Sequence, residues 1–198
     1  MKTGYSGDRW VVDAKGYSIA SGYKWLKLQY ADVDWSSWVW NRLNIPRHRF
    51  ICWMIMWKKI RVRAHLAKIG VITDDKCPLC ENSAETVEHL FFNCQYTRKC
   101  CIELQSRIGQ NISFSSLEDC YQKLLDIKGR FQRQVFQSCY AGLLYCIWCQ
   151  RNKAVWDKSI MKTEKLIQNL CRDIYHRITQ VMPAKTSRKK IEWFNALY

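Results

Sequence analysis

The sequence has no long apolar run and little glycine or proline. Its most apolar stretch, residues 50–57, is followed by two lysines, and it contains no run of eighteen apolar residues, so no segment has the length and hydrophobicity of a membrane-spanning helix. No apolar core of a secretory leader follows Met1-Lys-Thr-Gly. With 8 Gly, 3 Pro, 48% hydrophobic and 25% charged residues, the chain is neither fibrous nor disordered in composition. We expect a globular protein with no membrane partner and no small-molecule substrate.

Acidic residues are also scarce, and their distribution is uneven. The chain has 32 Lys and Arg against 17 Asp and Glu, a formal charge of +15, which favours a polyanionic partner such as nucleic acid. Residues 41–70 contain no Asp or Glu at all. Their basic residues are Arg42, Arg47, Arg49, Lys58, Lys59, Arg61, Arg63 and Lys68. A stretch without carboxylates indicates a surface for phosphates, the alternative being a basic face that is merely solvated.

Cysteine is abundant, but not in the manner of a secreted scaffold. The 11 Cys are an odd number, and several lie in aromatic, helical-looking segments. A reducing compartment is therefore expected, nuclear or cytoplasmic.

Helical periodicity dominates after the first forty residues. Pro46 is suited to a first helical turn. The apolar positions after it follow at i, i+3, i+4 and i+7, which predicts that this face is buried: Phe50, Trp53, Met54 and Trp57. A short second helix is predicted to end at Gly70. A capping box at Ser116 and Asp119 predicts a helix that runs toward Ile127. A long helix is predicted over residues 131–156, and the last helix over residues 163–181, which Pro183 ends. An extended pair is expected within residues 10–19 and a short helix over residues 21–30.

The most specific motif is a cluster of cysteine and histidine. Cys77 and Cys80 are separated by two residues, His89 follows after eight more, and Cys94 after another four. Two thiolates in a tight turn, completed by a later His and Cys, form a tetrahedral site for one structural Zn²⁺ with no open position. A helix over residues 84–92 is expected to place Glu85 and His89 one turn apart. The alternative is a set of ordinary buried thiols.

Other candidate sites are weaker. Cys146 and Cys149 repeat the two-residue spacing, and Cys171 with His176 would be needed to complete a second set, but no Gly or Pro makes the turn, so we expect a helix face lined with thiols. The residues from Tyr30 to Asp34 read Tyr-Ala-Asp-Val-Asp, close to a polymerase Tyr-Ala-Asp-Asp motif with the second carboxylate displaced. We expect no catalytic residues and no enzyme activity.

These motifs together resemble a known family. The matching residues are Trp38-Val-Trp40, Pro46, Phe50, Trp53, Leu66, Gly70, Cys77, Cys80, Glu85-Thr86, the His89-Leu-Phe-Phe-x-Cys94 block and the segment Ile147-Trp148-x2-Arg151-Asn152-x3-Trp156. They resemble the zinc-binding domain that follows the reverse transcriptase in plant LINE-type (non-LTR) retrotransposons, over about residues 10–156. The resemblance implies that Cys77, Cys80, His89 and Cys94 bind zinc. It also implies that the domain holds template RNA or target DNA in a ribonucleoprotein while a separate polymerase domain copies. Because polymerase and endonuclease regions are absent here, the chain is expected to be a C-terminal fragment or a stand-alone descendant.

The expected fold is mainly α, a small zinc-stabilised helical domain with a short extended N-terminal segment and C-terminal helices. Residues 1–40 form the N-terminal segment, residues 41–100 a basic helical hairpin with the zinc site, and residues 101–198 a helical region packed on it, all in one compact unit. No linker or repeat separates them.

Two functions fit these features. The first is a non-catalytic nucleic-acid-binding module, with RNA favoured. Its phosphate-binding residues would be Arg47, Arg49, Lys58, Lys59, Arg61 and Arg63, with Trp57, Trp38 and Tyr96 as candidates for stacking on bases. The second is a zinc-stabilised protein-interaction module recruited by a host complex, in which aromatic side chains bind a partner chain. A reverse transcriptase domain or a host protein is the expected protein partner. The basic residues Lys185, Arg188, Lys189 and Lys190 fit a nuclear signal or a phosphate-binding tail equally well.

Overall fold

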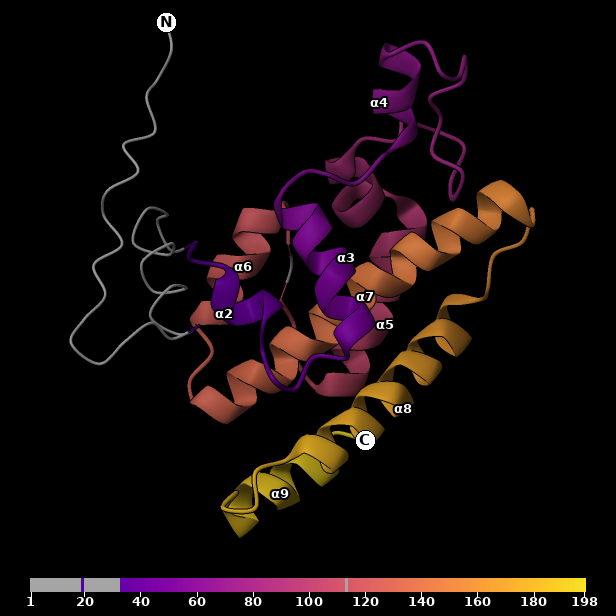
Figure 1. Ribbon diagram of the computed structural model, residues 1–198. Coiled ribbons are helices and arrows are strands. Elements are labelled where there is room, and N and C mark those ends of the chain that lie inside the picture. Colours follow the sequence, from indigo (N-terminus) through magenta and orange to yellow (C-terminus); the bar gives the residue numbers. More distant parts are fainter. Residues whose placement is uncertain (1–18, 20–32, 113) are drawn as a thin grey trace, which may run out of the picture. The chain divides into compact units, whose positions relative to one another are not determined.

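The computed structural model describes residues 19, 33–112 and 114–198 (Figure 1). By its internal contacts the chain divides into two units, Met1–Asp34 and Trp35–Tyr198, and the second is described here. The elements expected within residues 10–30, and most of the Tyr-Ala-Asp-Val-Asp segment, lie outside the described residues.

The regular structure of the second unit is helical. Its elements are α2 (Ser36–Val39), α3 (Pro46–Met56), α4 (Arg63–Lys68), the π-helix η1 (His89–Asn93), α5 (Gln95–Ile108), α6 (Leu117–Leu125), α7 (Arg130–Trp156), α8 (Thr163–Val181) and α9 (Arg188–Asn195). Within the described residues there is no β-strand, only one isolated antiparallel bridge between Lys76 and Ala84. The prediction of a mainly α fold is confirmed. None of the helices in this part of the chain is long and apolar enough to span a bilayer.

The long helix α7 is the centre of the unit, and α3, α5, α6 and α8 pack around it (Figure 1). Most of its first eighteen residues are buried, so it is covered on several sides rather than along one stripe. Helices α3 and α8 both approach it at Gly142. A Cβ atom at this position would lie 2.6 Å from Leu170 Cδ1 and 3.2 Å from His48 Nδ1. Glycine therefore permits the close approach of three helices.

Several local signals in the sequence specify helix ends correctly. Pro46 is the first residue of α3. Gly70 has a φ of 75°, the left-handed conformation that glycine adopts without a steric penalty, just beyond α4. Ser116 Oγ accepts a hydrogen bond from the Asp119 backbone N–H at 3.1 Å and caps α6. The predicted helix over residues 163–181 has the same bounds as α8.

Two predictions about helices are wrong. First, α8 is not the last helix, because α9 follows it and buries Phe194 completely, with the Phe194 ring stacked on Tyr175 at 5.4 Å between centroids. Second, α3 does not bury the aromatic face. Its buried residues are His48, Cys52 and Ile55, which face α7.

The aromatic residues of α3 consequently lie on its outer side. The side chains of Phe50 and Trp57 are 58% and 48% exposed, and Trp53 is half-buried. The Phe50 and Trp53 rings stack with centroids 6.0 Å apart, and Trp57 meets Trp35 edge-on at 5.7 Å. The periodicity correctly predicts the helix α3, but the aromatic face that it predicts to be buried is the outer face.

Candidate metal centre

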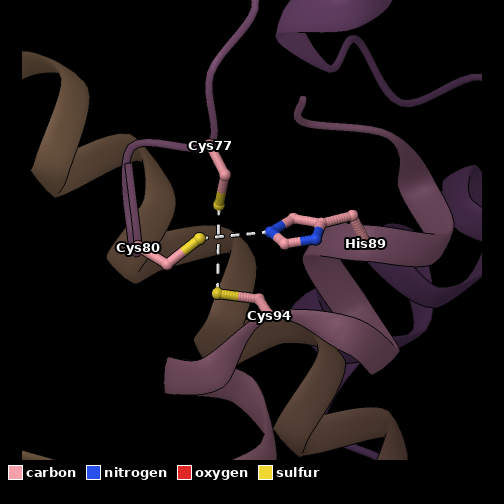
Figure 2. A group of neighbouring side chains, drawn as sticks. All are labelled: Cys77, Cys80, His89 and Cys94. Carbon is pink, nitrogen blue, oxygen red and sulfur yellow. Dashed lines mark hydrogen bonds between the residues drawn. The ribbon is translucent and has the colours of Figure 1, made fainter. Parts of the chain in front are cut away.

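Four donor side chains from three short segments converge on one point (Figure 2). Cys77 and Cys80 lie in the turn that the Lys76–Ala84 bridge closes, His89 is the first residue of η1, and Cys94 is the N-cap of α5. Their donor atoms all lie within 4.8 Å of one another. Cys77 and Cys94 are buried and the other two side chains are half-buried, so the site opens only slightly to solvent.

The spacing of the donor atoms fits a tetrahedral zinc ion. The Sγ atoms of Cys77 and Cys94 are 3.9 Å apart, and Cys80 Sγ lies 3.3 Å from His89 Nε2. Zn–S bonds of about 2.3 Å and Zn–N bonds of about 2.0–2.1 Å imply tetrahedral edges of about 3.8 Å between sulfurs and about 3.5 Å between sulfur and nitrogen. Three thiols and one imidazole form a complete structural ligand set. The predicted cofactor, one zinc ion held by these four residues, fits the site without rearrangement.

Backbone hydrogen bonds shape the cysteine turn. The Cys77 N–H donates to Ser83 O at 2.8 Å, and the Glu81 N–H donates to Cys77 O, also at 2.8 Å. Glu81 has a φ of 58°, the left-handed conformation that reverses the chain between the two halves of the turn. At its base the Glu85 N–H donates to Asp75 O at 2.7 Å. The turn is therefore closed by its own backbone before any metal is considered.

The segment that carries His89 differs from its prediction. The expected helix over residues 84–92, with Glu85 one turn before His89, is right only in its later part: Glu85 belongs to the extended chain beside the cysteine turn, and helical structure begins at Val87 and continues as η1. The His89 N–H donates to Thr86 Oγ1 at 3.0 Å, and the Cys94 N–H donates to His89 O at 2.7 Å, an i to i+5 bond. This wider turn brings two ligands five residues apart to the same side, as π-turns often do at functional sites.

The thiols of Cys77 and Cys94 are hydrogen-bonded to each other. Cys77 Sγ donates to Cys94 Sγ, which lowers the pKa of the Cys94 thiol and raises that of Cys77. The backbone N–H groups of Thr97 and Tyr96 at the start of α5 lower the pKa of Cys94 further, because a helix N-terminus stabilises a thiolate. These hydrogen bonds favour the thiolate form of Cys94, which is the form that binds a metal.

The six residues predicted to bind phosphates are not equally available. Lys58, Lys59 and Arg61 are exposed and follow α3 directly. Arg47 is ion-paired with Asp173 at 3.1 Å and Arg63 with Asp74 at 3.0 Å, while Arg49 is half-buried and donates to Arg42 O at 3.1 Å.

Two of the three aromatic residues predicted to stack on bases are buried, so those predictions are wrong. Trp38 is fully buried and its indole N–H donates to Gln137 O at 2.8 Å. Tyr96 is 9% exposed and its hydroxyl donates to Met161 O at 2.7 Å. Both are core residues whose polar atoms are satisfied internally, and Trp57 alone of the three lies at the surface.

Glu85, which was not predicted as a site residue, connects the cysteine turn to the helices. The Glu85 carboxylate is fully buried and pairs with Arg151 of α7. It also accepts the Arg63 N–H at 2.6 Å, while its own backbone oxygen accepts the Ala64 N–H at 3.2 Å. The only available signal was that Glu85 and Arg151 both lie in segments resembling one family, and nothing in either segment says that the two side chains meet.

The fold and the site together define a class, a helical protein with a closed four-ligand zinc centre. Comparison with known families agrees: residues 17–100, less than half of the chain, match the family described as zinc-binding in reverse transcriptase. This segment therefore matches a zinc-binding domain of the reverse transcriptase type, and the predicted resemblance is confirmed at this level. Neither the curated proteins nor the solved structures give a match to the chain.

Proposed function

We propose that the chain is a non-catalytic, zinc-stabilised module of retroelement origin that binds single-stranded nucleic acid, RNA in preference to DNA, in a ribonucleoprotein of the reverse-transcription type. The observation that supports this most is the outer face of α3, which leaves Phe50 and Trp57 exposed directly before three exposed basic residues, Lys58, Lys59 and Arg61. We call these five residues, with Trp53, the α3 surface. Arg61 Nη1 lies 2.6 Å from His65 Nε2, a hydrogen bond that leaves its positive charge in place.

Aromatic rings beside exposed cations are suited to single strands. Unpaired bases stack on exposed rings, and each stacked base contributes about 1–3 kcal/mol, while the cations follow the backbone phosphates. Duplexes keep their bases stacked internally, so exposed rings add little to their binding. The stacked pair of Phe50 and Trp53, with centroids 6.0 Å apart, is already held in place and loses little conformational entropy when a base docks.

The zinc centre has a structural role in this proposal. Its four protein ligands leave no coordination position for a substrate, so it does not act as a catalytic metal. It instead fixes the cysteine turn, and through Glu85 the start of α4, where Arg63 and Ala64 donate their backbone N–H groups. The basic segment between α3 and α4 is thereby held in place at its α4 end.

The partners and compartment follow from the same chemistry. Thiolate ligands and unpaired cysteines persist in a reducing compartment, which supports a nuclear or cytoplasmic location as part of the proposal. A reverse transcriptase domain or a host protein would supply the catalytic step that this chain lacks.

Fluorescence anisotropy over a salt series tests the proposal. Zinc-loaded protein is titrated with single-stranded RNA, duplex RNA and duplex DNA, and each contacted phosphate of a single strand adds about 0.7 to the slope of log K against log salt. Reversing Lys58, Lys59 and Arg61 together to Glu should reduce that slope by about 2. The matched control changes three lysines that are exposed elsewhere, Lys153, Lys158 and Lys162, to Glu. It changes the net charge by the same amount as the first triple variant.

Two outcomes contradict nucleic-acid binding by the α3 surface. One is weak, salt-independent binding to all three nucleic acids, which would favour the alternative of a protein-interaction module. The other is an equal loss of slope in the two triple variants, which would mean that net charge alone carries the binding.

A further inference from the structure

A second concentration of positive charge lies at the other end of α7 from the zinc centre. A pocket of about 410 Å³ is lined there by four basic side chains: Arg42 before α3, Arg130 in the first turn of α7, Lys185 between α8 and α9, and Lys190 in α9. Its volume is within the range of about 300–1,000 Å³ typical of small-ligand sites. Arg130 and Arg151 are separated by nearly the whole of α7, a distance of about 30 Å at 1.5 Å per residue.

The four cations of this pocket are not neutralised within the described part of the chain. No Asp or Glu is among the lining residues there, and the ion pairs of the described residues use other basic side chains, such as Arg47 with Asp173 and Arg188 with Glu192. Cations that converge in a hollow without a carboxylate repel one another. Such an arrangement is stabilised when an anion binds.

Neighbouring groups strengthen the positive potential. Arg49 and Arg177 both donate to the backbone oxygen of Arg42, at 3.1 and 3.2 Å. Burial and the nearby Arg177 guanidinium lower the pKa of Arg49. The N-terminus of α7 also lies here, with its cap residue Gly129 providing no side-chain hydrogen bond, so the helix dipole adds partial positive charge at Arg130.

We propose that this pocket binds a polyphosphate group. An internal phosphodiester carries one negative charge, which four cations exceed, whereas a terminal triphosphate or a free tripolyphosphate carries three or more negative charges close together. One source of this ligand, the 5′-triphosphate end of a nucleic acid lying along α3, rests on the proposed function; the other, a free polyphosphate, does not. The geometry suits the first source, because Arg42 precedes the N-terminal end of α3 and Lys58 follows its C-terminal end.

Isothermal titration calorimetry with sodium tripolyphosphate tests the pocket directly. The full-length, zinc-loaded protein is used, and its zinc content is measured after the titration because polyphosphates chelate metals. Lys190→Glu and Arg130→Glu should each weaken binding about tenfold or more, since each replaces an attractive charge beside the anionic ligand with a repulsive one. Lys189→Glu is the matched control, an exposed neighbour on the same helix that does not line the pocket.

The control variant should bind tripolyphosphate within about threefold of the parent, the range expected for a general charge effect. Circular dichroism melting checks that each variant is folded, and Lys190→Glu, at an exposed position, remains informative if Arg130→Glu does not fold. Absence of binding at millimolar tripolyphosphate, or an equal loss in Lys189→Glu, would overturn the proposal.

A second arm separates the two sources and the two proposals. RNA of one sequence is compared with a 5′-triphosphate and with a 5′-hydroxyl. Tighter binding of the triphosphate form, lost in Lys190→Glu, assigns the pocket to a nucleic-acid end, and equal binding of both forms assigns it to free polyphosphate. If tripolyphosphate binds but no RNA does, the polyphosphate site is supported and the proposed nucleic-acid-binding function is contradicted. If RNA binds but tripolyphosphate does not, the proposed function is supported and the polyphosphate site is contradicted.

Discussion

Arg151 and Glu85, 66 residues apart, form a buried bidentate ion pair. Arg151 Nε lies 2.7 Å from Glu85 Oε1, and Arg151 Nη2 lies 2.8 Å from Oε2. The guanidinium also lies over the Trp148 ring, 4.9 Å from its centroid, which adds a cation–π contact. Since Glu85 also holds the start of α4, one carboxylate connects the central helix, the cysteine turn and the basic segment.

Removing one member of this pair should destabilise the protein strongly. Arg151→Ala leaves the Glu85 carboxylate buried without its cation, which costs about 3–5 kcal/mol in comparable buried pairs. We expect urea unfolding of the zinc-loaded protein to show a decrease of this size. The double variant Glu85→Ala, Arg151→Ala should lose less than the sum of the two single losses, because no uncompensated charge remains.

A surface pair provides the control for that experiment. Arg107 and Glu103 form an i to i+4 ion pair at 2.8 Å on α5, with both side chains partly exposed. Arg107→Ala should change the free energy of unfolding by no more than about 0.5 kcal/mol. A similar loss in Arg151→Ala and Arg107→Ala would show that the buried pair has no special structural role.

Zinc should be bound with a stoichiometry of about one per chain. Cys77→Ser and His89→Ala should each reduce the zinc content measured by plasma mass spectrometry and the cooperativity of thermal unfolding, since structural zinc sites contribute on the order of 10 kcal/mol to folding. Cys149→Ser is the matched control, because that cysteine belongs to the other pair with two-residue spacing, on α7. Zinc far below one per chain in the parent would contradict the assignment.

The sequence predicts the zinc ligands because their geometry is local. A turn with two thiols, then a helical segment that presents His89 and Cys94, fits within eighteen consecutive residues, and turn chemistry and spacing determine it. Helix ends at Pro46, Gly70 and Ser116 are equally local signals, since each acts on its own backbone.

Most of the missed features depend on partners far away in the chain. Which face of α3 is buried depends on α7, and its buried contact is made by His48 rather than by the aromatic residues. The pairing of Glu85 with Arg151 follows from the packing of α7 on the cysteine turn. Helix α9 was missed because Pro183 signals a stop, and only contact with Tyr175 shows why Phe194 is buried. Periodicity specifies that a helix has two faces, and tertiary packing decides between them.

Exposed aromatic residues of α3 should contribute to binding of single strands. Trp57→Ala should weaken binding of single-stranded RNA by about 1–3 kcal/mol, the contribution of one stacked base, and leave the salt slope unchanged because no cation is lost. The matched control is Trp156→Ala, since Trp156 is the more exposed tryptophan and lies at the end of α7. Equal losses for both variants, measured by anisotropy, would remove the α3 surface from the binding model.

His48 should make stability depend on pH below neutrality. It is buried between α3 and α7 beside Tyr145, its Nδ1 has no hydrogen-bond partner, and burial, with the nearby Arg47 cation, lowers its pKa from 6.5 to about 4. Between these values the unfolded chain binds the proton and the folded chain does not, so this contribution is complete above about pH 6.5 and is lost as the pH falls toward 4.

The loss assigned to His48 should total on the order of 3 kcal/mol, at 1.36 kcal/mol per pKa unit. His48→Leu, which removes the titrating ring and its unpartnered nitrogen, should flatten the dependence of unfolding free energy on pH between 6.5 and 4.5, relative to the parent. The difference between the two proteins isolates His48 from zinc-ligand protonation, which both share. The control His176→Leu, at an exposed position, should leave the pH dependence of the parent unchanged. If His176→Leu flattens this dependence as much as His48→Leu does, His48 is not the source of the pH dependence.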